Sequence, residues 1–198
     1  DMDYDQIFPT LWVGSHPRKS EEIDRLVRET RISAILSLLT DEDLGRLGID
    51  WPELQAQCGR RQVELRRLPV IDGDTEDLRE KLADCVRALD DLLAAGRTVY
   101  LHCAAGIERS PSVAIAYLCW CMGYDLAEAA AYVNSCRGCS PDIEAIESAT
   151  RDLLRGDSVR QRIEHKAIEF SGGTASAVWA EARKHVLKQL IMEHKLSQ

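Results

Sequence analysis

Residues 102–110 read His-Cys-Ala-Ala-Gly-Ile-Glu-Arg-Ser, with five residues between a cysteine and an arginine. A thiol attacks phosphorus as the thiolate. A loop that opens into a helix stabilises that charge with its backbone N–H groups and with the positive end of the helix dipole. The same N–H groups can bind a phosphate oxyanion. The spacing therefore predicts a loop that curls once around a phosphate, with Cys103 as the nucleophile.

The other residues of this loop are of types that suit phosphate binding. The planar guanidinium of Arg109 can hold two phosphate oxygens at once, which a lysine could not do. Gly106 lies where the backbone must turn tightly or approach the ligand without a Cβ. The hydroxyl of Ser110 can reach back to the sulfur and help it leave from a phosphoenzyme. We expect the phosphate to be held by Ala104, Ala105, Gly106, Ile107, Glu108 and Arg109.

A purely structural role is the alternative to catalysis. Cys103 could be a small core residue at the end of a strand and Arg109 a surface charge, because this spacing of cysteine and arginine recurs by chance. The flanking sequence favours catalysis. Residues 98–102 are a short β-rich run, and residues 111–122 form an apolar helix that starts with proline. The loop is therefore expected between a strand and a helix N-terminus.

Together, His102, the cysteine loop and the following Ser110 and Pro111 resemble the Cys-dependent dual-specificity phosphatases, a family within the protein tyrosine phosphatase superfamily. In that family an upstream aspartate, on a loop after a strand, is the general acid. Asp72 matches it, at 103 − 72 = 31 positions before the cysteine. It would protonate the leaving oxygen and later deprotonate the attacking water. The resemblance implies neither a metal nor another cofactor.

Asp74 is the rival candidate for the general acid. Either aspartate could instead be a turn residue, because the run from Asp72 to Thr75 suits a turn ahead of a helix. The register with the family motif favours Asp72.

Stretches outside the loop are similar to the plant-type glucan phosphatases, a dual-specificity subgroup that acts on phosphorylated starch-like glucans. The matching stretches are residues 4–7 and 11–15, 41–44 and 48–50, 139–141, 145–146 and 149–150, and a C-terminal extension. The subgroup typically has glycine before the loop arginine and alanine after it, where this sequence has Glu108 and Ser110. It also has an aromatic residue beside the general acid, where this sequence has Gly73.

Three functions are therefore weighed. The first is a phosphoprotein phosphatase for phosphotyrosine and phosphoserine/threonine, which Glu108, Ser110 and the missing aromatic favour. The second is a glucan phosphatase, with Trp51 as a platform for sugar stacking or, alternatively, as a half-buried surface tryptophan. The third is a pseudophosphatase that only binds phosphate, which the intact nucleophile, arginine and general acid disfavour. Glu108 also repels polyphosphorylated lipid headgroups.

Composition fits an ordinary soluble enzyme. The chain has 198 residues, 45% of them hydrophobic, and a formal net charge of −8. We expect no nucleic acid or anionic membrane as a partner, because neither polyanion is drawn to an acidic surface. No stretch approaches a membrane span, and the first residues lack the features of a signal peptide. Four arginines could form a local basic patch or simply solvated edges: Arg60, Arg61, Arg66 and Arg67.

Seven cysteines, an odd number, fit no secreted disulfide framework and indicate a reducing, intracellular compartment. This would be the cytoplasm, or a plastid if the substrate is a glucan. Cys58 and Cys85 are candidates for a thiol that protects Cys103 as a disulfide, although burial as small hydrophobic residues is the commoner role. Cys136 and Cys139 could form a redox pair, but they lack the second ligand pair of a zinc site.

Strand and helix patterns alternate along the chain. This predicts an α/β fold with a central, mostly parallel sheet flanked by helices and with the cysteine loop at the carboxyl ends of the strands. The expected strands are residues 7–14, 32–38, 63–68 and 98–102. The expected helices are residues 20–30, 52–59, 75–95, 111–122, 126–136 and 141–154.

We expect a phosphatase domain at residues 1–155 and a C-terminal helical extension at residues 156–198. Residues 156–175 are polar with glycine breakers, and a helix is expected at residues 176–195. Its apolar stripe would comprise Ala177, Trp179 or Ala180, Val186, Leu187, Leu190 and Ile191. Such a stripe must be covered, and we expect it to pack on the phosphatase domain rather than on a partner. The oligomeric state stays open.

Overall fold

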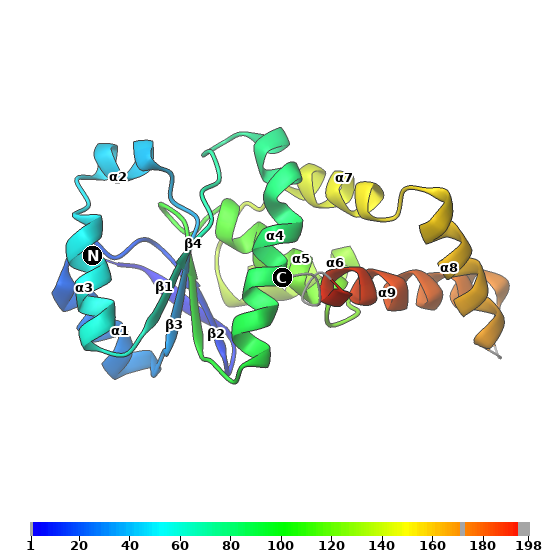
Figure 1. The fold of residues 1–198 in the computed structure, drawn as a ribbon, viewed down its shortest axis with the longest axis horizontal. Helices are drawn as coiled ribbons and strands as arrows, with labels where there is room; N and C mark the ends of the chain where they lie inside the picture. Colours follow the sequence, from blue (N-terminus) through cyan, green and yellow to red (C-terminus); the bar gives the residue numbers. More distant parts are fainter. Residues whose placement is uncertain (1, 171–172, 194–198) are drawn as a thin grey trace.

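A five-stranded sheet forms the centre of the computed structural model, which describes residues 2–170 and 173–193 (Figure 1). Its strands are β1 (Tyr4–Phe8), β2 (Leu11–Gly14), β3 (Ala34–Ser37), β4 (Glu64–Arg67) and β5 (Val99–His102), in the order β1-β2-β5-β3-β4. The hairpin β1–β2 is antiparallel and the other pairs are parallel. The predicted mostly parallel sheet is thereby confirmed. Strand β5 lies between β2 and β3, so its end is at the middle of the sheet.

Helices cover both faces of this sheet, as Figure 1 shows. On one face lie α1 (Ser20–Thr30) and α3 (Trp51–Arg60), whose core includes Ile23, Leu26 and Leu54. On the other lie α4 (Thr75–Ala94), α5 (Arg109–Trp120), α6 (Leu126–Cys136) and α7 (Ile143–Leu153). Every residue of β5 is buried between the two layers. The loop that follows β5 therefore starts from a fully buried, central strand.

Helix α4 shows how the sequence pattern becomes packing. Its buried side chains recur at helical spacing along one face: Leu78, Leu82, Cys85, Val86, Leu89 and Leu92. Burial of such a stripe against the sheet drives the helix into place. Asp74 caps the start of this helix, because its side chain accepts a hydrogen bond from Asp77 N. The start of α4 thus fixes the end of the loop that carries Asp72.

Two helices of the structure are absent from the sequence-based expectation. Helix α2 (Asp41–Leu47) has only seven residues, too few to show a period, and it begins with a capping box between Thr40 and Asp43. Helix α8 (Asp157–Glu169) occupies the polar segment that was expected to be irregular. Only Ile163 of α8 is buried, with Val159 and Ala167 partly buried beside it, so the apolar stripe of this helix is narrow among many polar residues.

Helix α9 (Ala175–Glu193) contacts α4, α5 and α8. Leu187 and Ile191 join the main core, whereas Ala182 and Val186 pack with Ile163 of α8 in a small separate cluster. The expected stripe is wrong in its first half. Ala177, Trp179 and Ala180 are exposed, because the α9 N-terminus extends beyond the phosphatase layers (Figure 1). Residues 194–195 of the expected helix lie outside the described residues.

No helix in the described part of the chain is long and apolar enough to cross a membrane.

Candidate active site

The sulfur of Cys103 lies at the end of β5 and accepts two hydrogen bonds. Gly106 N and Ser110 Oγ each donate to it over 3.3 Å. The side chain is buried, at 3% exposure. Donors aimed at a sulfur stabilise its thiolate form, and α5 begins at Arg109, so the positive end of its dipole faces the loop. The sequence placed the start of this helix two residues later, at Pro111.

All six carbonyl groups of residues 103–108 accept hydrogen bonds from donors of the protein. The donors, in loop order, are His102 Nδ1, His16 N and Nδ1, Arg137 Nη2, Arg137 Nε, Ser140 N, and Ser112 N and Oγ. In a trans peptide the C=O and the following N–H point in opposite directions. The N–H groups of the loop therefore point away from the donors that hold its carbonyls. Gly106 N, one of these groups, donates to the sulfur, an arrangement of the kind that can bind an anion.

Arg137 is buried and ties the loop to the N-terminal strand. Its guanidinium donates to the carbonyls of Ala105 and Gly106 and forms ion pairs with Asp3 and Asp5, at 2.9 and 2.8 Å. His102, which precedes the nucleophile, is buried as well, and this burial lowers its pKa to about 4. The imidazole is therefore neutral near pH 7 and can donate from Nδ1 to a loop carbonyl.

Gly106 has a conformation and surroundings that admit no side chain. Its φ is +71°, in the left-handed region. A Cβ added there would lie 2.4 Å from the carbonyl carbon of Gly14. The close approach of these two backbones closes the loop on β2 and explains the glycine at position 106. At Gly14 a Cβ would instead lie 2.5 Å from Asp3 O, Tyr100 Oη and Tyr4 Cβ.

The guanidinium of Arg109 is fully buried and is held from one side. Its Nη1 donates to Asp43 Oδ2 over 2.8 Å and to the carbonyl of Val70 over 2.7 Å. Nε and Nη2 have no hydrogen-bond partner among the described residues. Nη2 lies 2.9 Å from Asp72 Oδ1, close enough for an ion pair but without hydrogen-bond geometry. Nη1 of the guanidinium is therefore fixed, while the edge formed by Nε and Nη2 can bind two oxygens of an anion.

Asp43 is the carboxylate that fixes Arg109, and it is only 3% exposed. Burial alone would raise the pKa of this carboxyl, but hydrogen bonds from Arg109 and Arg46 outweigh burial and lower the pKa to about 2. Asp43 is thus a permanent anion near neutral pH. A buried cation with a fixed counterion keeps its orientation when a ligand enters.

Asp72 and Asp74, the two candidate acids, lie in different environments. Asp72 is half-exposed and faces Arg109, with Arg46 Nη2 at 3.7 Å from its other oxygen. Asp74 caps α4 through its side chain, as described above. The loop that carries both aspartates is anchored to α4 by a hydrogen bond from Ile71 N to Asp77 Oδ2. Of the two, it is Asp72 that lies beside the Nη2 edge of Arg109.

Glu108 lies partly buried at the mouth of the loop. Burial raises the pKa of its carboxyl, and the nearby charges of Asp72 and Asp142 raise it further. The carboxylate would repel an incoming phosphate dianion.

Trp51, Cys58 and Cys85 have no hydrogen bond or ion pair to this cluster among the described residues. Trp51 begins α3, and the guanidinium of Arg67 lies over its ring, 5.1 Å from the centroid. One face of the indole is therefore unavailable to a sugar. Cys58 packs in the core on the α1–α3 face, and burial raises its pKa to about 11. Cys85 is fully buried, with its pKa raised by burial to about 12, so neither thiol is readily ionised.

Sequence reasoning missed Asp43, Arg137 and His16. Asp43 gave one usable signal, because Thr40 and Asp43 have the spacing of a capping box. Nothing in the sequence near Arg137 or His16 links either residue to the loop. Both act over long sequence separations, which only the fold brings together.

Comparison with known proteins agrees with this geometry. Residues 15–148 match the family described as dual specificity phosphatase, catalytic domain. Phosphoglucan phosphatase LSF1 of Arabidopsis thaliana is 35% identical over 153 residues, which cover 77% of this chain and 26% of that protein. Human dual specificity protein phosphatase 5 is 28% identical over 134 residues, which cover 67% of this chain and 30% of that protein.

The chain therefore spans about a quarter to a third of the length of these relatives. Its fold is similar to the crystal structure of PTPMT1, with a TM-score of 0.62 and 22% sequence identity over 85% of this chain and all of that one. The match of the family over more than half of the sequence decides the assignment. The chain belongs to the dual specificity phosphatase catalytic domain family, which consists of Cys-dependent phosphatases.

Proposed function

We propose that this chain hydrolyses phosphomonoesters through a cysteinyl-phosphate intermediate. The Cys103 thiolate attacks phosphorus while Asp72, as the acid, protonates the leaving oxygen. Asp72, now a carboxylate, then takes a proton from a water that attacks the phosphocysteine and releases inorganic phosphate. Ser110 Oγ, 3.3 Å from the sulfur, stabilises the departing thiolate in this second step. Arg109 and the loop amides bind the phosphate oxygens throughout.

The buried edge of Arg109 carries this proposal. Leaving charged N–H donors buried without partners destabilises a fold. Neither Nε nor Nη2 has a hydrogen-bond partner among the described residues, although Asp72 Oδ1 lies 2.9 Å from Nη2, and both nitrogens lie on the same side of the guanidinium. Two oxygens of a phosphoryl group would satisfy both at once, beside the sulfur that must attack its phosphorus. A structural role for Arg109 offers no comparable reason for this arrangement.

We further propose that the substrates are phosphoproteins carrying phosphotyrosine or phosphoserine/threonine. Ile71 and Ile107, from the acid loop and the cysteine loop, are 48% and 46% exposed. Two exposed isoleucines beside the phosphate site suit contact with a peptide side chain better than with a hydroxyl-rich sugar. The Trp51 ring, the candidate sugar platform, is covered on one face by Arg67.

A phosphoglucan is the second candidate substrate, because LSF1, a phosphoglucan phosphatase, is similar over most of this chain. A pseudophosphatase is disfavoured by the intact Cys103, Arg109 and Asp72. In either catalytic case the enzyme is expected in a reducing, intracellular compartment: the cytoplasm for phosphoproteins or a plastid for glucans. Neither nucleic acid nor a metal has a part in the proposed chemistry.

Phosphate release from phosphopeptides and from phosphorylated amylopectin, measured side by side, tests this assignment. The Cys103→Ser variant serves as the blank. We expect faster release from phosphotyrosine and phosphothreonine peptides than from the glucan. Preference for the glucan, weakened by Trp51→Ala, would overturn the choice of substrate but not the chemistry.

A further inference from the structure

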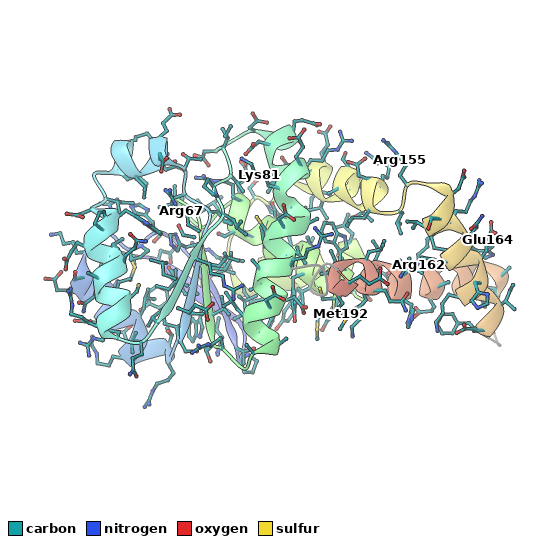
Figure 2. The ribbon with its side chains drawn as sticks, in the orientation of Figure 1. Arg67, Lys81, Arg155, Arg162, Glu164 and Met192 are labelled. Atoms are coloured by element: carbon teal, nitrogen blue, oxygen red, sulfur yellow. The ribbon has the colours of Figure 1, made fainter. Side chains whose placement is uncertain are left out.

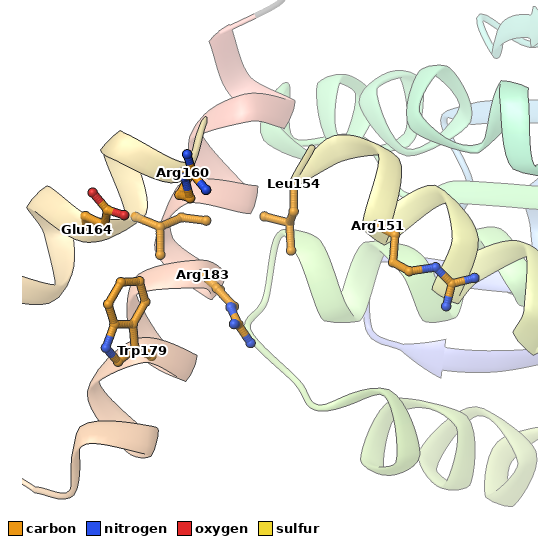
Figure 3. A pocket seen from close by; sticks show the side chains of 7 residues that line it. Arg151, Leu154, Arg160, Glu164, Trp179 and Arg183 are labelled. Carbon is orange, nitrogen blue, oxygen red and sulfur yellow. The ribbon is translucent and has the colours of Figure 1, made fainter. Parts of the chain in front are cut away.

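A pocket of about 460 Å³ lies at the far end of the molecule from α1, between α7, α8 and α9. Figure 3 shows its lining side chains, which come from all three helices. The catalytic residues do not line it. Its chemistry is therefore independent of the phosphate site.

The pocket is positively charged although the chain as a whole carries a net charge of −8. Arg151, Arg160 and Arg183 line it, opposed by Glu164. Arg160 is paired with Asp157 at 2.9 Å. Arg183 has neither an ion pair nor a hydrogen bond among the described residues, and it lines the pocket from α9 (Figure 3). Clustered arginines of this kind recognise acidic and phosphorylated segments of other proteins.

An apolar wall stands beside these charges. Trp179 is 39% exposed and shares the pocket with Leu154 and Ile163. Tryptophan and arginine are the side chains that most often dominate the binding energy of protein interfaces.

Helix α7 connects this pocket to the phosphate site. At its N-terminal end, Ser140 N donates to the carbonyl of Ile107, and Asp142 N donates to Ser112 Oγ. At its C-terminal end, Arg151 and Leu154 line the pocket. The helix has 11 residues and is therefore about 16 Å long. An extended peptide needs at least about five residues to cover that distance.

We propose that this pocket binds an acidic segment of the phosphoprotein substrate, at least about five residues from the phosphorylated one. Carboxylates or a second phosphate of the segment would pair with Arg183, Arg151 and Arg160, and an apolar side chain would lie on Trp179. The proposal rests on the phosphoprotein function argued above. It assigns the C-terminal helices a role in choosing substrates.

The test compares two series of phosphotyrosine peptides. One carries an acidic cluster with a leucine, placed from about four to about sixteen residues from the phosphotyrosine. The other has the acidic residues replaced by their amides. For the wild-type chain we expect the acidic peptides to have KM about tenfold lower beyond the minimum spacing, with kcat unchanged. The difference in KM between acidic and neutral peptides should become smaller at high salt.

Three variants locate this preference. Arg183→Glu and Trp179→Ala should each bring the KM ratio of neutral to acidic peptides close to one. Arg28→Glu, an exposed residue of α1 at the opposite end of the molecule, makes the same change in net charge and should keep the ratio. Thermal unfolding of each variant checks that it is folded.

Other results would overturn the inference. Equal KM values for the two peptide series, or a preference for acidic peptides that survives Arg183→Glu, would contradict peptide binding by the pocket. Neither result would contradict the phosphoprotein phosphatase function. A loss of phosphoglucan turnover in Arg183→Glu, with the peptide ratio unchanged, would reassign the pocket to carbohydrate. Hydrolysis of neither peptide series would contradict the phosphoprotein function and the inference with it.

Discussion

At the scale of single residues, the site depends on two opposing demands on Arg109. Its guanidinium must be buried to bind phosphate strongly, yet it must keep one edge free for the ligand. Asp43 and the Val70 carbonyl meet both demands by holding Nη1 alone. The sequence motif identifies the arginine but not its counterion, because the two are 66 positions apart in the chain.

Asp43→Asn should lower kcat/KM by about a hundredfold, because Arg109 loses the anion that orients it; an effect of this size is typical of a lost transition-state contact. The variant should also be less stable near neutral pH. The pKa of Asp43 is lowered from 3.8 to about 2, so its stabilisation of the fold is present above about pH 4 and is lost as pH falls through about 2.

Denaturant unfolding across this pH range measures the second effect. The lowered pKa of Asp43 corresponds to a difference of about 2 kcal/mol in the free energy of unfolding between wild type and variant at neutral pH. This difference should become smaller toward pH 2. A difference that does not change with pH would show that Asp43 is not the titrating partner of Arg109.

Glu108→Gln should lower KM for a small aryl phosphate by about two- to fivefold near neutral pH, because it removes a charge that repels the phosphate dianion. The pKa of Glu108 is raised by burial and by its acidic neighbours. As the pH is lowered, wild-type Glu108 is therefore protonated at a higher pH than an ordinary glutamate. The difference in KM between wild type and variant should then decrease. The same KM for both proteins at every pH would contradict this role.

At the scale of the elements, strand β5 and helices α4 and α5 build the site by placing the two loops that carry its chemistry. Their patterns were strong in the sequence, and their existence and type are confirmed. Helices α2 and α8 were missed for two different physical reasons. Helix α2 is held by an N-terminal cap and a C-terminal glycine rather than by an apolar stripe. Helix α8 has a narrow stripe in which Ile163 is buried and Val159 and Ala167 are partly buried.

The two aspartates of the α4 entry loop separate a chemical role from a structural one. Asp74→Ala removes the N-cap of α4, so it should lower the unfolding free energy by about 1 kcal/mol and leave kcat nearly unchanged. Asp72→Ala should leave stability nearly unchanged and reduce kcat, most for substrates with poor leaving groups. Leaving-group dependence measured for both variants, together with their melting temperatures, decides which aspartate is the acid. The opposite pattern would make Asp74 the acid.

At the scale of the whole molecule, the C-terminal helices link the phosphatase core to a second surface. Arg162 of α8, labelled in Figure 2, pairs with Glu193 of α9. Leu187 and Ile191 of α9 enter the main core. The division at residues 155 and 156 stays a prediction. The sequence could not show that the first half of α9 is exposed, because its apolar residues are spaced like those that are buried.

Two adjacent residues of α9 test how firmly this extension belongs to the phosphatase core. Ile191 is fully buried and Met192 is 46% exposed. Ile191→Ser should destabilise the chain by about 3 kcal/mol, because it leaves a cavity and buries a hydroxyl, whereas Met192→Ser should cost about 0.5 kcal/mol or less. Denaturant unfolding with a single transition for both proteins is expected. Unfolding of Ile191→Ser in two separate steps would show that the helices form an independent unit.

The central claim is that the phosphoryl group passes through Cys103. Rapid acid quenching of the enzyme with a phosphorylated substrate, followed by mass spectrometry of its peptides, tests this claim most directly. We expect one phosphoryl group on the peptide that contains Cys103, more of it in Ser110→Ala because thiolate departure is slowed, and none in Cys103→Ser. Undiminished turnover by Cys103→Ser, or a phosphoryl group on a different residue, would contradict the account.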